Sequence, residues 1–175
     1  MDEELLSRQV PHSLEAEQSV LGAILIDSQC VADVIGILKP GDFYLKQNRE
    51  IYEAIYEMFN YSQTIDPVTV LDKLRELGYY TEKSRDYVLQ LMDITPTAAN
   101  AERYANIVRD KAMLRGLDQA GKEIVELVAE QTGTPSEMLE SAEKKIYALR
   151  TINLNMASAN ASQSPLGTSN PFSPF

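Results

Sequence analysis

The segment from residue 11 to residue 27, PHSLEAEQSVLGAILID, constrains the fold more than any other part of the chain. Ser13 is typical of a helix N-cap, because its hydroxyl can accept a hydrogen bond from a free N–H of the first turn. Glu15 and Glu17 then place negative charge where the helix dipole is positive. The second half of the segment is apolar apart from Gly22, and a helix that is apolar on every face must be surrounded by other elements. The segment therefore predicts the central helix of an all-α domain, with Gly22 allowing a neighbouring backbone to approach closely.

Composition narrows the possible functions before any motif is considered. The chain has 175 residues, 44% of them hydrophobic and 24% charged, as in a globular protein with one ordinary core. Its net charge of −10 argues against tight autonomous binding to nucleic acid, which requires neutralisation of phosphates. Cys30 is the single cysteine, so no internal disulfide is possible. The acidic N-terminus and the absence of a long apolar run indicate a cytoplasmic protein with no membrane span.

Helical spacing of apolar residues predicts four more helices in residues 1–97, which we expect to form a compact globular subdomain. A second helix is expected from Ser28 until Pro40-Gly41, a third at about 47–60, and a fifth at about 84–94. The fourth is expected to start at an Asp66 N-cap followed by Pro67, and to end at Gly78. Between the second and third helices, the turn at residues 42–44 carries two aromatic side chains that we expect to return to the core. On the third helix, Ile51, Ile55, Met58 and Phe59 are expected to point inward, with Tyr52 and Tyr56 on its flank.

Residues 98–150 predict an antiparallel helical hairpin. A proline-free stretch at about 98–131 carries an apolar stripe, although Gly116 and Gly121 weaken it enough to predict a break or bend there. Thr134 and Glu137 then have the spacing of a capping box, starting a last helix that runs to about Arg150. A pair of helices with one apolar stripe each covers only part of both stripes, so the hairpin predicts self-association or docking on another chain.

The remaining residues, 151–175, carry no charged side chain and are rich in serine, asparagine and proline. They have no periodic pattern of apolar residues. We expect a flexible tail or linker.

The sequence predicts no catalytic, cofactor-binding or metal-binding site. His12 lacks a nearby nucleophile or second ligand, and Cys30 has apolar neighbours, so structural roles are favoured for both. Neither G-x-x-x-x-G-K-[ST] nor G-x-G-x-x-G occurs. A run of basic residues on the long helix, Arg103, Arg109, Lys111 and Arg115, is interspersed with acids, which favours a solvated face over a phosphate track.

Four blocks of this sequence together resemble a known family. PHSLEAEQSVLGAILID, GDFY, DPVTVLDKL and TPTAANAERYANIVRDKAMLR follow one another at spacings similar to those of the N-terminal domain of the bacterial hexameric replicative helicase, the DnaB family. The resemblance covers about residues 8–149. After Arg150 the sequence departs from the family's linker helix and ATPase domain, so residues 151–175 are native, vector-encoded or frame-shifted.

The resemblance implies a globular helical subdomain followed by a hairpin, with no enzyme activity in this chain. In the family, such domains form a collar, a trimer of dimers above the motor ring, and the collar docks primase and the helicase loader. ATP and magnesium would bind the motor domain, which is absent from this chain. A stand-alone protein that mimics the collar and regulates or inhibits the helicase is the alternative interpretation.

The resemblance also points to individual residues. We expect a primase or dimer surface to include Glu15, Tyr87, Leu117 and Ile124. The last two could equally fill the seam between the helices of the hairpin. Arg109 and Arg115 are candidates for approaching DNA at the inner rim of the collar, although autonomous DNA binding is expected to be weak or absent.

Overall fold

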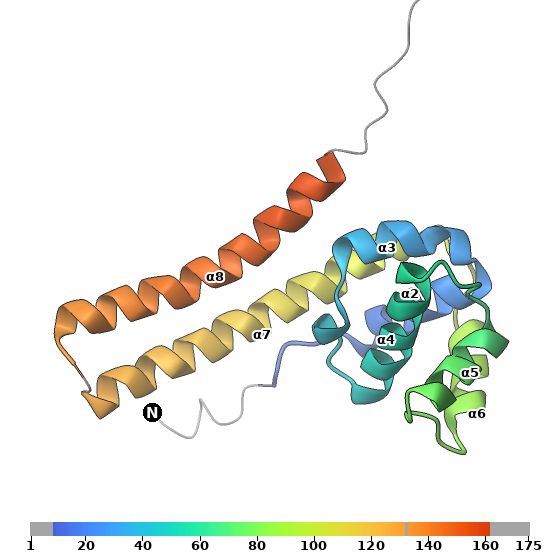
Figure 1. Cartoon of the computed structure of the whole chain (residues 1–175), viewed down its shortest axis with the longest axis horizontal. Helices are drawn as coiled ribbons and strands as arrows, with labels where there is room; N and C mark the ends of the chain where they lie inside the picture. Colours follow the sequence, from blue (N-terminus) through green and yellow to red (C-terminus); the bar gives the residue numbers. More distant parts are fainter. Residues whose placement is uncertain (1–8, 132, 162–175) are drawn as a thin grey trace, which may run out of the picture.

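The computed structural model describes residues 9–131 and 133–161, with residues 150–161 as backbone alone. Within these ranges the chain forms helices and turns and no β-strand, which confirms the all-α prediction (Figure 1). The elements are α2 (Leu14–Ile26), η1 (Ser28–Cys30), α3 (Val31–Ile37), η2 (Pro40–Asp42), α4 (Lys46–Asn60), α5 (Pro67–Glu76), α6 (Ser84–Asp93), α7 (Ala101–Glu130) and α8 (Pro135–Ala161). Helices α2 to α6 form a globule with the start of α7, and α7 and α8 project from it as an antiparallel hairpin.

Helix α2 is the centre of the globule, as the sequence predicts. The Ser13 hydroxyl accepts a hydrogen bond from Ala16 N at 3.3 Å, and residues 20–25 are buried. The helix packs against α4, α6 and α7. Gly22 faces α6 so closely that a Cβ atom there would lie 2.3 Å from the carbonyl oxygen of Leu91. The predicted close approach of a neighbouring backbone is therefore confirmed.

The segment between α2 and α4 is less regular than the sequence predicts. The second helix is divided into the 3₁₀ turn η1 and the short helix α3. Of the two turn aromatics, Phe43 is fully buried, whereas Tyr44 is 39% exposed and stacks on His12 with ring centroids 4.4 Å apart. On α4, Tyr52 is buried rather than on the flank, because its hydroxyl can donate to the carbonyl of Leu38 at 3.2 Å. Phe59, predicted to point inward, is 36% exposed, whereas its neighbour Met58 in the same last turn of α4 is buried.

Helix α5 begins and ends as predicted. The Asp66 carboxylate accepts from Val68 N at 2.8 Å and from Thr69 N at 3.0 Å, and Gly78 has a φ of +76°.

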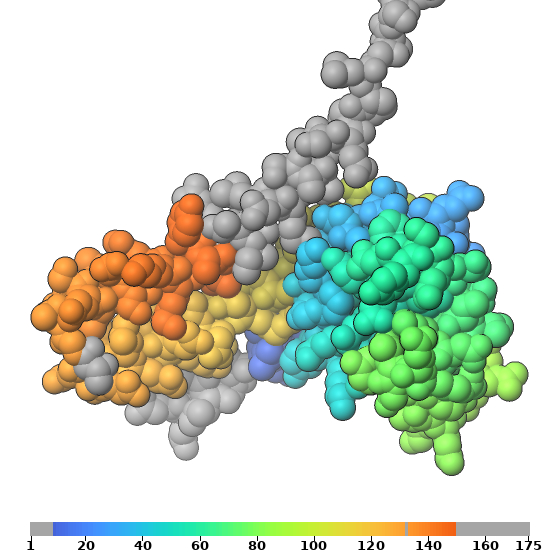
Figure 2. Space-filling view, in the orientation of Figure 1, coloured from blue at the N-terminus to red at the C-terminus, as the bar shows by residue number. Residues whose placement is uncertain are grey.

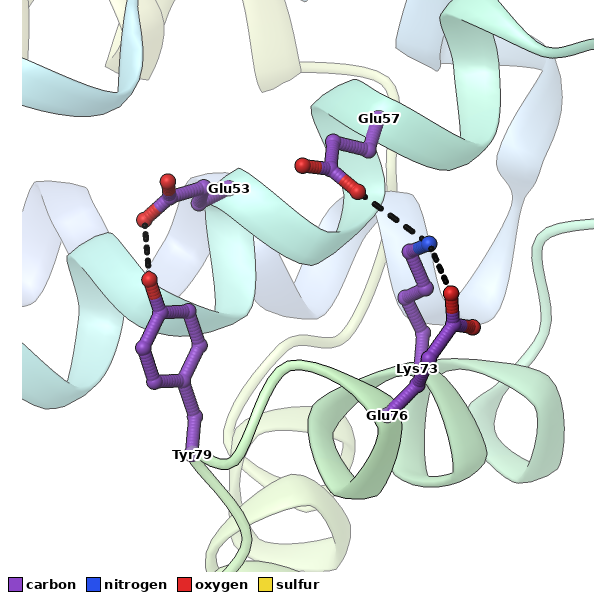
Figure 3. A network of polar contacts seen from close by, with 5 residues as sticks. All are labelled: Glu53, Glu57, Lys73, Glu76 and Tyr79. Carbon is purple, nitrogen blue, oxygen red and sulfur yellow. Dashed lines mark hydrogen bonds and ion pairs between the residues drawn. The ribbon is translucent and has the colours of Figure 1, made fainter.

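Polar contacts then attach α5 and the loop after it to α4 (Figure 3). Lys73 is nearly buried, with its ammonium 3.1 Å from Glu57 Oε2 and 3.0 Å from Glu76 Oε1. The hydrogen bonds with Glu76 and Glu57 raise the pKa of Lys73 above its ordinary value. Tyr79 donates to Glu53 Oε2 at 3.2 Å.

The hairpin is built on one unbroken helix of 30 residues, α7, so the predicted break is wrong. Gly116 lies against α8, where a Cβ atom would be 2.8 Å from Leu149 Cδ2, and Gly121 is exposed. A glycine costs about 1 kcal/mol in a helix, which packing against the globule and α8 can offset. The first turns of α7 contribute Ala101, Ala105 and Val108 to the globular core, so that core extends beyond residue 97.

Helix α8 starts at the predicted capping box and continues past its predicted end. Glu137 N donates to Thr134 Oγ1 at 3.3 Å, and Thr134 N donates to Glu137 Oε2 at 2.7 Å. The helix extends to Ala161, so the prediction of a flexible tail starting at 151 is wrong for residues 151–161. Extending an existing helix avoids the nucleation cost, and this stretch contains no proline. Residues 162–175 of the predicted tail lie outside the described residues.

Among the described residues, no single helix is both long and apolar enough to cross a bilayer. The pair Leu14–Ile26 and Ser28–Ile37, bent by 117°, reaches the required length and composition, and most of α2 is buried inside the globule.

Candidate functional site

The hairpin leaves a row of large apolar side chains in solvent, which we call the hairpin surface. Of the described side chains after Val108, Ala120 is the one apolar residue that is fully buried. The hairpin surface consists of Leu114, Leu117, Val125, Val128, Leu139, Ile146 and Tyr147, each between 44% and 69% exposed. Figure 2 shows the part of the hairpin farthest from the globule, in yellow and orange, projecting from it. An apolar surface of this size typically marks a site for another protein.

Two apolar grooves indent this surface. The first, of about 640 Å³, lies at the tip of the hairpin and is lined mainly by Ile124, Leu127, Val128, Met138, Leu139 and Ala142. The second, of about 380 Å³, shares Ala142 and is lined further along α8 by Ile146 and Tyr147. Grooves with such a lining fit apolar side chains of a binding partner.

Polar interactions hold the two helices of the hairpin in this arrangement. Lys145 of α8 pairs with Glu123 of α7, and Gln119 donates to the same carboxylate at 3.0 Å. These contacts hold the pKa of Glu123 below its ordinary value. The connecting loop turns through Gln131 and Gly133, which both have positive φ. The grooves are thus bounded by helices whose separation is fixed.

The structure places two of the predicted interface residues on the hairpin. Leu117 is 44% exposed and belongs to the hairpin surface. Ile124 is half-buried and lines the tip groove. Leu117 is thus accessible to another chain, whereas Ile124 lies partly between α7 and α8, where it borders the tip groove.

The other two predicted interface residues lie on the globule. Glu15 is exposed in the first turn of α2. Tyr87 on α6 is half-buried; its hydroxyl donates to Asn48 Oδ1 at 2.6 Å and accepts from Gln18 Nε2 at 3.3 Å. Burial raises the pKa of Tyr87. The hydroxyl is therefore already used within the fold, and the accessible part of the side chain is its ring.

The sequence reasoning missed the role of Glu17, which is 1% exposed. Its carboxylate accepts from Tyr44 N at 2.7 Å, from Leu45 N at 3.3 Å and from the side-chain amide of Asn48 at 2.9 Å. It thereby holds the turn that leads into α4 and anchors the first turn of that helix through the side chain of Asn48. No local pattern signals this role, because the three donors lie 27 to 31 residues away along the chain.

The two candidate DNA-proximal arginines have different surroundings. Arg115 donates to the carbonyls of Pro11, at 2.7 Å, and Asp42, and its guanidinium lies 5.7 Å from the ring centroid of Tyr44. Burial lowers its pKa. Arg109 is 31% exposed, its Nη2 lies 3.4 Å from Asp110 Oδ1, and its Nε is buried without a hydrogen-bond partner. Arg115 thus joins the base of the hairpin to the globule, and Arg109 is the more available of the two.

Reactive groups in the described residues have structural surroundings. The His12 ring stacks on Tyr44, with Nδ1 2.6 Å from the carbonyl oxygen of Val10. Burial raises the pKa of Cys30 to about 11, which disfavours the reactive thiolate. No three side chains of the described part are grouped so that they could hold a metal ion.

Known proteins show the same domain. The sequence model described as "DnaB-like helicase N terminal domain" matches residues 9–110. The replicative DNA helicase DnaB of Leifsonia xyli subsp. xyli is 37% identical over 143 residues, 81% of this chain and 31% of that protein. DnaB of Geobacillus stearothermophilus is 34% identical over 150 residues, 82% of this chain and 32% of that protein. The chain thus spans about a third of the length of these curated relatives.

A solved structure agrees with the sequence comparison. The crystal structure of the N-terminal domain of DnaB helicase from Mycobacterium tuberculosis superposes with a TM-score of 0.74 at 37% identity, covering 80% of this chain and 99% of that one. That structure also confirms the predicted class of helical fold. On this evidence, the chain belongs to the family of DnaB-like helicase N-terminal domains.

Proposed function

We propose that this domain pairs with a second copy through the hairpin surface, as the assembly unit of the collar of a replicative helicase. The observation that carries the proposal is the apolar hairpin surface with its two grooves. Covering one half-exposed side chain of this kind contributes about 1 kcal/mol. A symmetric pair that covers the hairpin surface of both copies then gains about 10–15 kcal/mol, against an association cost of about 4–15 kcal/mol. The expected dimer is therefore concentration-dependent, and a trimer of dimers requires further contacts.

Sedimentation velocity over a range of micromolar concentrations tests this assembly. We expect a monomer–dimer equilibrium that Val128→Asp, on the hairpin surface, shifts to monomer. Leu89→Asp, at a 48% exposed site on α6, is the matched control and should leave the equilibrium unchanged. A chain that stays monomeric at high micromolar concentration would overturn the proposal.

Docking of primase and the helicase loader on the same domain is the second part of the proposal. Leu117 and Ile124 offer apolar contact on the hairpin, and Glu15 and the ring of Tyr87 offer contact on the globule. Ile124→Glu should weaken capture of primase, but it also alters the tip groove. Glu15→Lys lies outside the hairpin surface, so weakened capture with unchanged dimerisation supports a separate docking contact. Unchanged primase binding by both variants would remove these residues from the interface.

The proposal also includes weak binding of DNA and no hydrolysis of ATP by this chain. Arg109 is accessible enough to approach a phosphate, and we expect weak binding of a single-stranded oligonucleotide that Arg109→Ala weakens further in fluorescence anisotropy. ATP and magnesium are proposed to act in the motor domain of the family, so the purified chain should not hydrolyse ATP. Measurable turnover would contradict this assignment. No observation on the described residues or in the comparisons favours the alternative, a stand-alone regulator of the helicase.

A further inference from the structure

A second recessed surface lies around the α4–α5 loop, residues 61–66, on the side of the globule turned away from the hairpin tip (Figure 1). Two grooves flank this loop and share residues 62–64. One, of about 540 Å³, has apolar walls from Val31, Phe59 and Ile65. The other, of about 490 Å³, is lined on its polar side by Asp72, Lys73 and Glu76. A recess with three apolar side chains among polar ones and a recess with two carboxylates and one ammonium group are thus adjacent on one surface.

The apolar part of this surface is exposed without a partner inside the chain. Tyr61 is 73% exposed and Phe59 is 36% exposed. The residue after Tyr61, Ser62, adopts a left-handed backbone with a φ of +52°. A non-glycine residue in this region is uncommon and is retained where the surrounding structure requires that backbone path. One aromatic side chain at the end of α4 and one at the start of the loop are thus exposed beside the grooves.

The charged part of this surface has an excess of carboxylates. Lys73 is already paired with Glu57 and Glu76, as Figure 3 shows. Arg75 is paired with Asp72, its Nη1 2.5 Å from Oδ1, and stacks over the ring of Tyr80. Three carboxylates, those of Glu57, Asp72 and Glu76, thus pair with these two cations, which leaves one net negative charge. The remaining negative charge favours a basic group on whatever binds there.

We propose that the α4–α5 loop and its two grooves form a docking surface for a short segment of a partner protein that carries an apolar side chain followed closely by lysine or arginine. The apolar side chain fills the recess between Val31, Phe59 and Ile65. The basic side chain reaches Asp72 and Glu76 across the shared residues 62–64. A second copy of this chain, with its net charge of −10, matches the acidic recess poorly. This surface is separate from the hairpin surface and does not depend on the function proposed for it.

The test is an NMR titration of the ¹⁵N-labelled full chain with a short synthetic peptide on a glycine–serine background. The peptide carries one phenylalanine and, two positions later, two arginines. We expect saturable shift changes at residues 59–65 and 72–76. Replacing the phenylalanine with glycine, or the arginines with glutamates, should weaken binding by about tenfold or more.

Matched protein variants separate this site from general charge attraction. Asp72→Asn should weaken binding, whereas Asp110→Asn, another exposed aspartate paired with a neighbouring arginine, should not. Phe59→Ser should weaken binding, and Leu89→Ser should not. Thermal unfolding followed by circular dichroism checks that each variant is folded, and Asp72→Asn, at the surface, keeps the test valid if Phe59→Ser unfolds.

Three results would overturn the proposal. Shift changes at the hairpin tip instead of residues 59–65 would place the peptide elsewhere. Equal weakening by Asp72→Asn and Asp110→Asn, or no saturation, would indicate non-specific charge attraction. Concentration-dependent shifts at residues 59–65 without peptide would show that a second copy covers this surface. Peptide binding that persists in Val128→Asp would show independence from the hairpin.

Discussion

Replacing Glu17 with alanine should lower the free energy of unfolding far more than the same change at Glu15, an exposed residue in the same turn of α2. The substitution leaves Tyr44 N, Leu45 N and the amide of Asn48 without their acceptor. A buried donor without a partner costs about 1–3 kcal/mol. Water can reach the donors beside the exposed Tyr44 but not the fully buried Asn48, and removing a buried carboxylate also relieves its desolvation. We therefore expect a net loss of about 3 kcal/mol in the free energy of unfolding.

The assay is unfolding by urea and by heat, followed by circular dichroism. A loss of about 3 kcal/mol lowers the midpoint of a chain of this size by about 6–12 °C. Glu17→Gln keeps an acceptor oxygen but brings a second NH₂ group towards Asn48, so its loss should be smaller, about 1–2 kcal/mol.

Glu15→Ala is the matched control for Glu17→Ala. It lies in the same first turn of α2 but is exposed, and it should cost about 0.3–1 kcal/mol through the helix dipole alone. If Glu15→Ala and Glu17→Ala destabilise the chain equally, the hydrogen bonds of the buried Glu17 carboxylate do not hold the turn before α4.

Three further predictions concern the packing and electrostatics of the fold. In urea unfolding, Gly22→Ala should destabilise the chain by about 1–3 kcal/mol, because the new Cβ atom would overlap with atoms of α6. Gly121→Ala, with open space around it, is the control and should be neutral or stabilising. A neutral Gly22→Ala would contradict the close packing of α2 on α6. Arg115→Met should speed amide exchange and proteolysis around residues 9–13, because it removes the donor to Pro11, and unchanged protection would refute the link. The hydrogen bonds from Thr134 hold the pKa of Glu137 below its ordinary value of 4.5. The contribution of Glu137 to stability is therefore present above about pH 4.5 and is lost as the pH falls through its folded pKa. Unfolding measured over a series of acid pH values should show this loss, and Glu137→Gln should make stability depend less steeply on pH.

Features that depend on neighbours within a few residues were predictable. The caps at Ser13, Asp66 and Thr134 each bind a backbone N–H no more than three residues away, so sequence spacing identifies them. The apolar stripes of the hairpin likewise exceed what two helices can cover, and this excess predicted the exposed apolar surface. The hydrogen bonds of Glu17 to the turn before α4 were not predictable, because 27 residues separate that carboxylate from Tyr44.

Burial along α4 shows why apolar character alone was insufficient. Tyr52 and Phe59 both carry an aromatic ring, yet the tyrosine is fully enclosed and the phenylalanine is partly exposed. The difference comes from which face of α4 meets the core, since Met58 beside Phe59 is buried, and from the carbonyl of Leu38 that satisfies the Tyr52 hydroxyl.

The order of helices, most of their ends and the excess of apolar surface on the hairpin follow from the sequence alone, because caps and periodicity act over a few residues. Which surfaces stay exposed, which helix approaches Gly22 and where the grooves lie were decided by tertiary packing. These features arise from contacts between residues distant in sequence, and no local pattern encodes the distance between them.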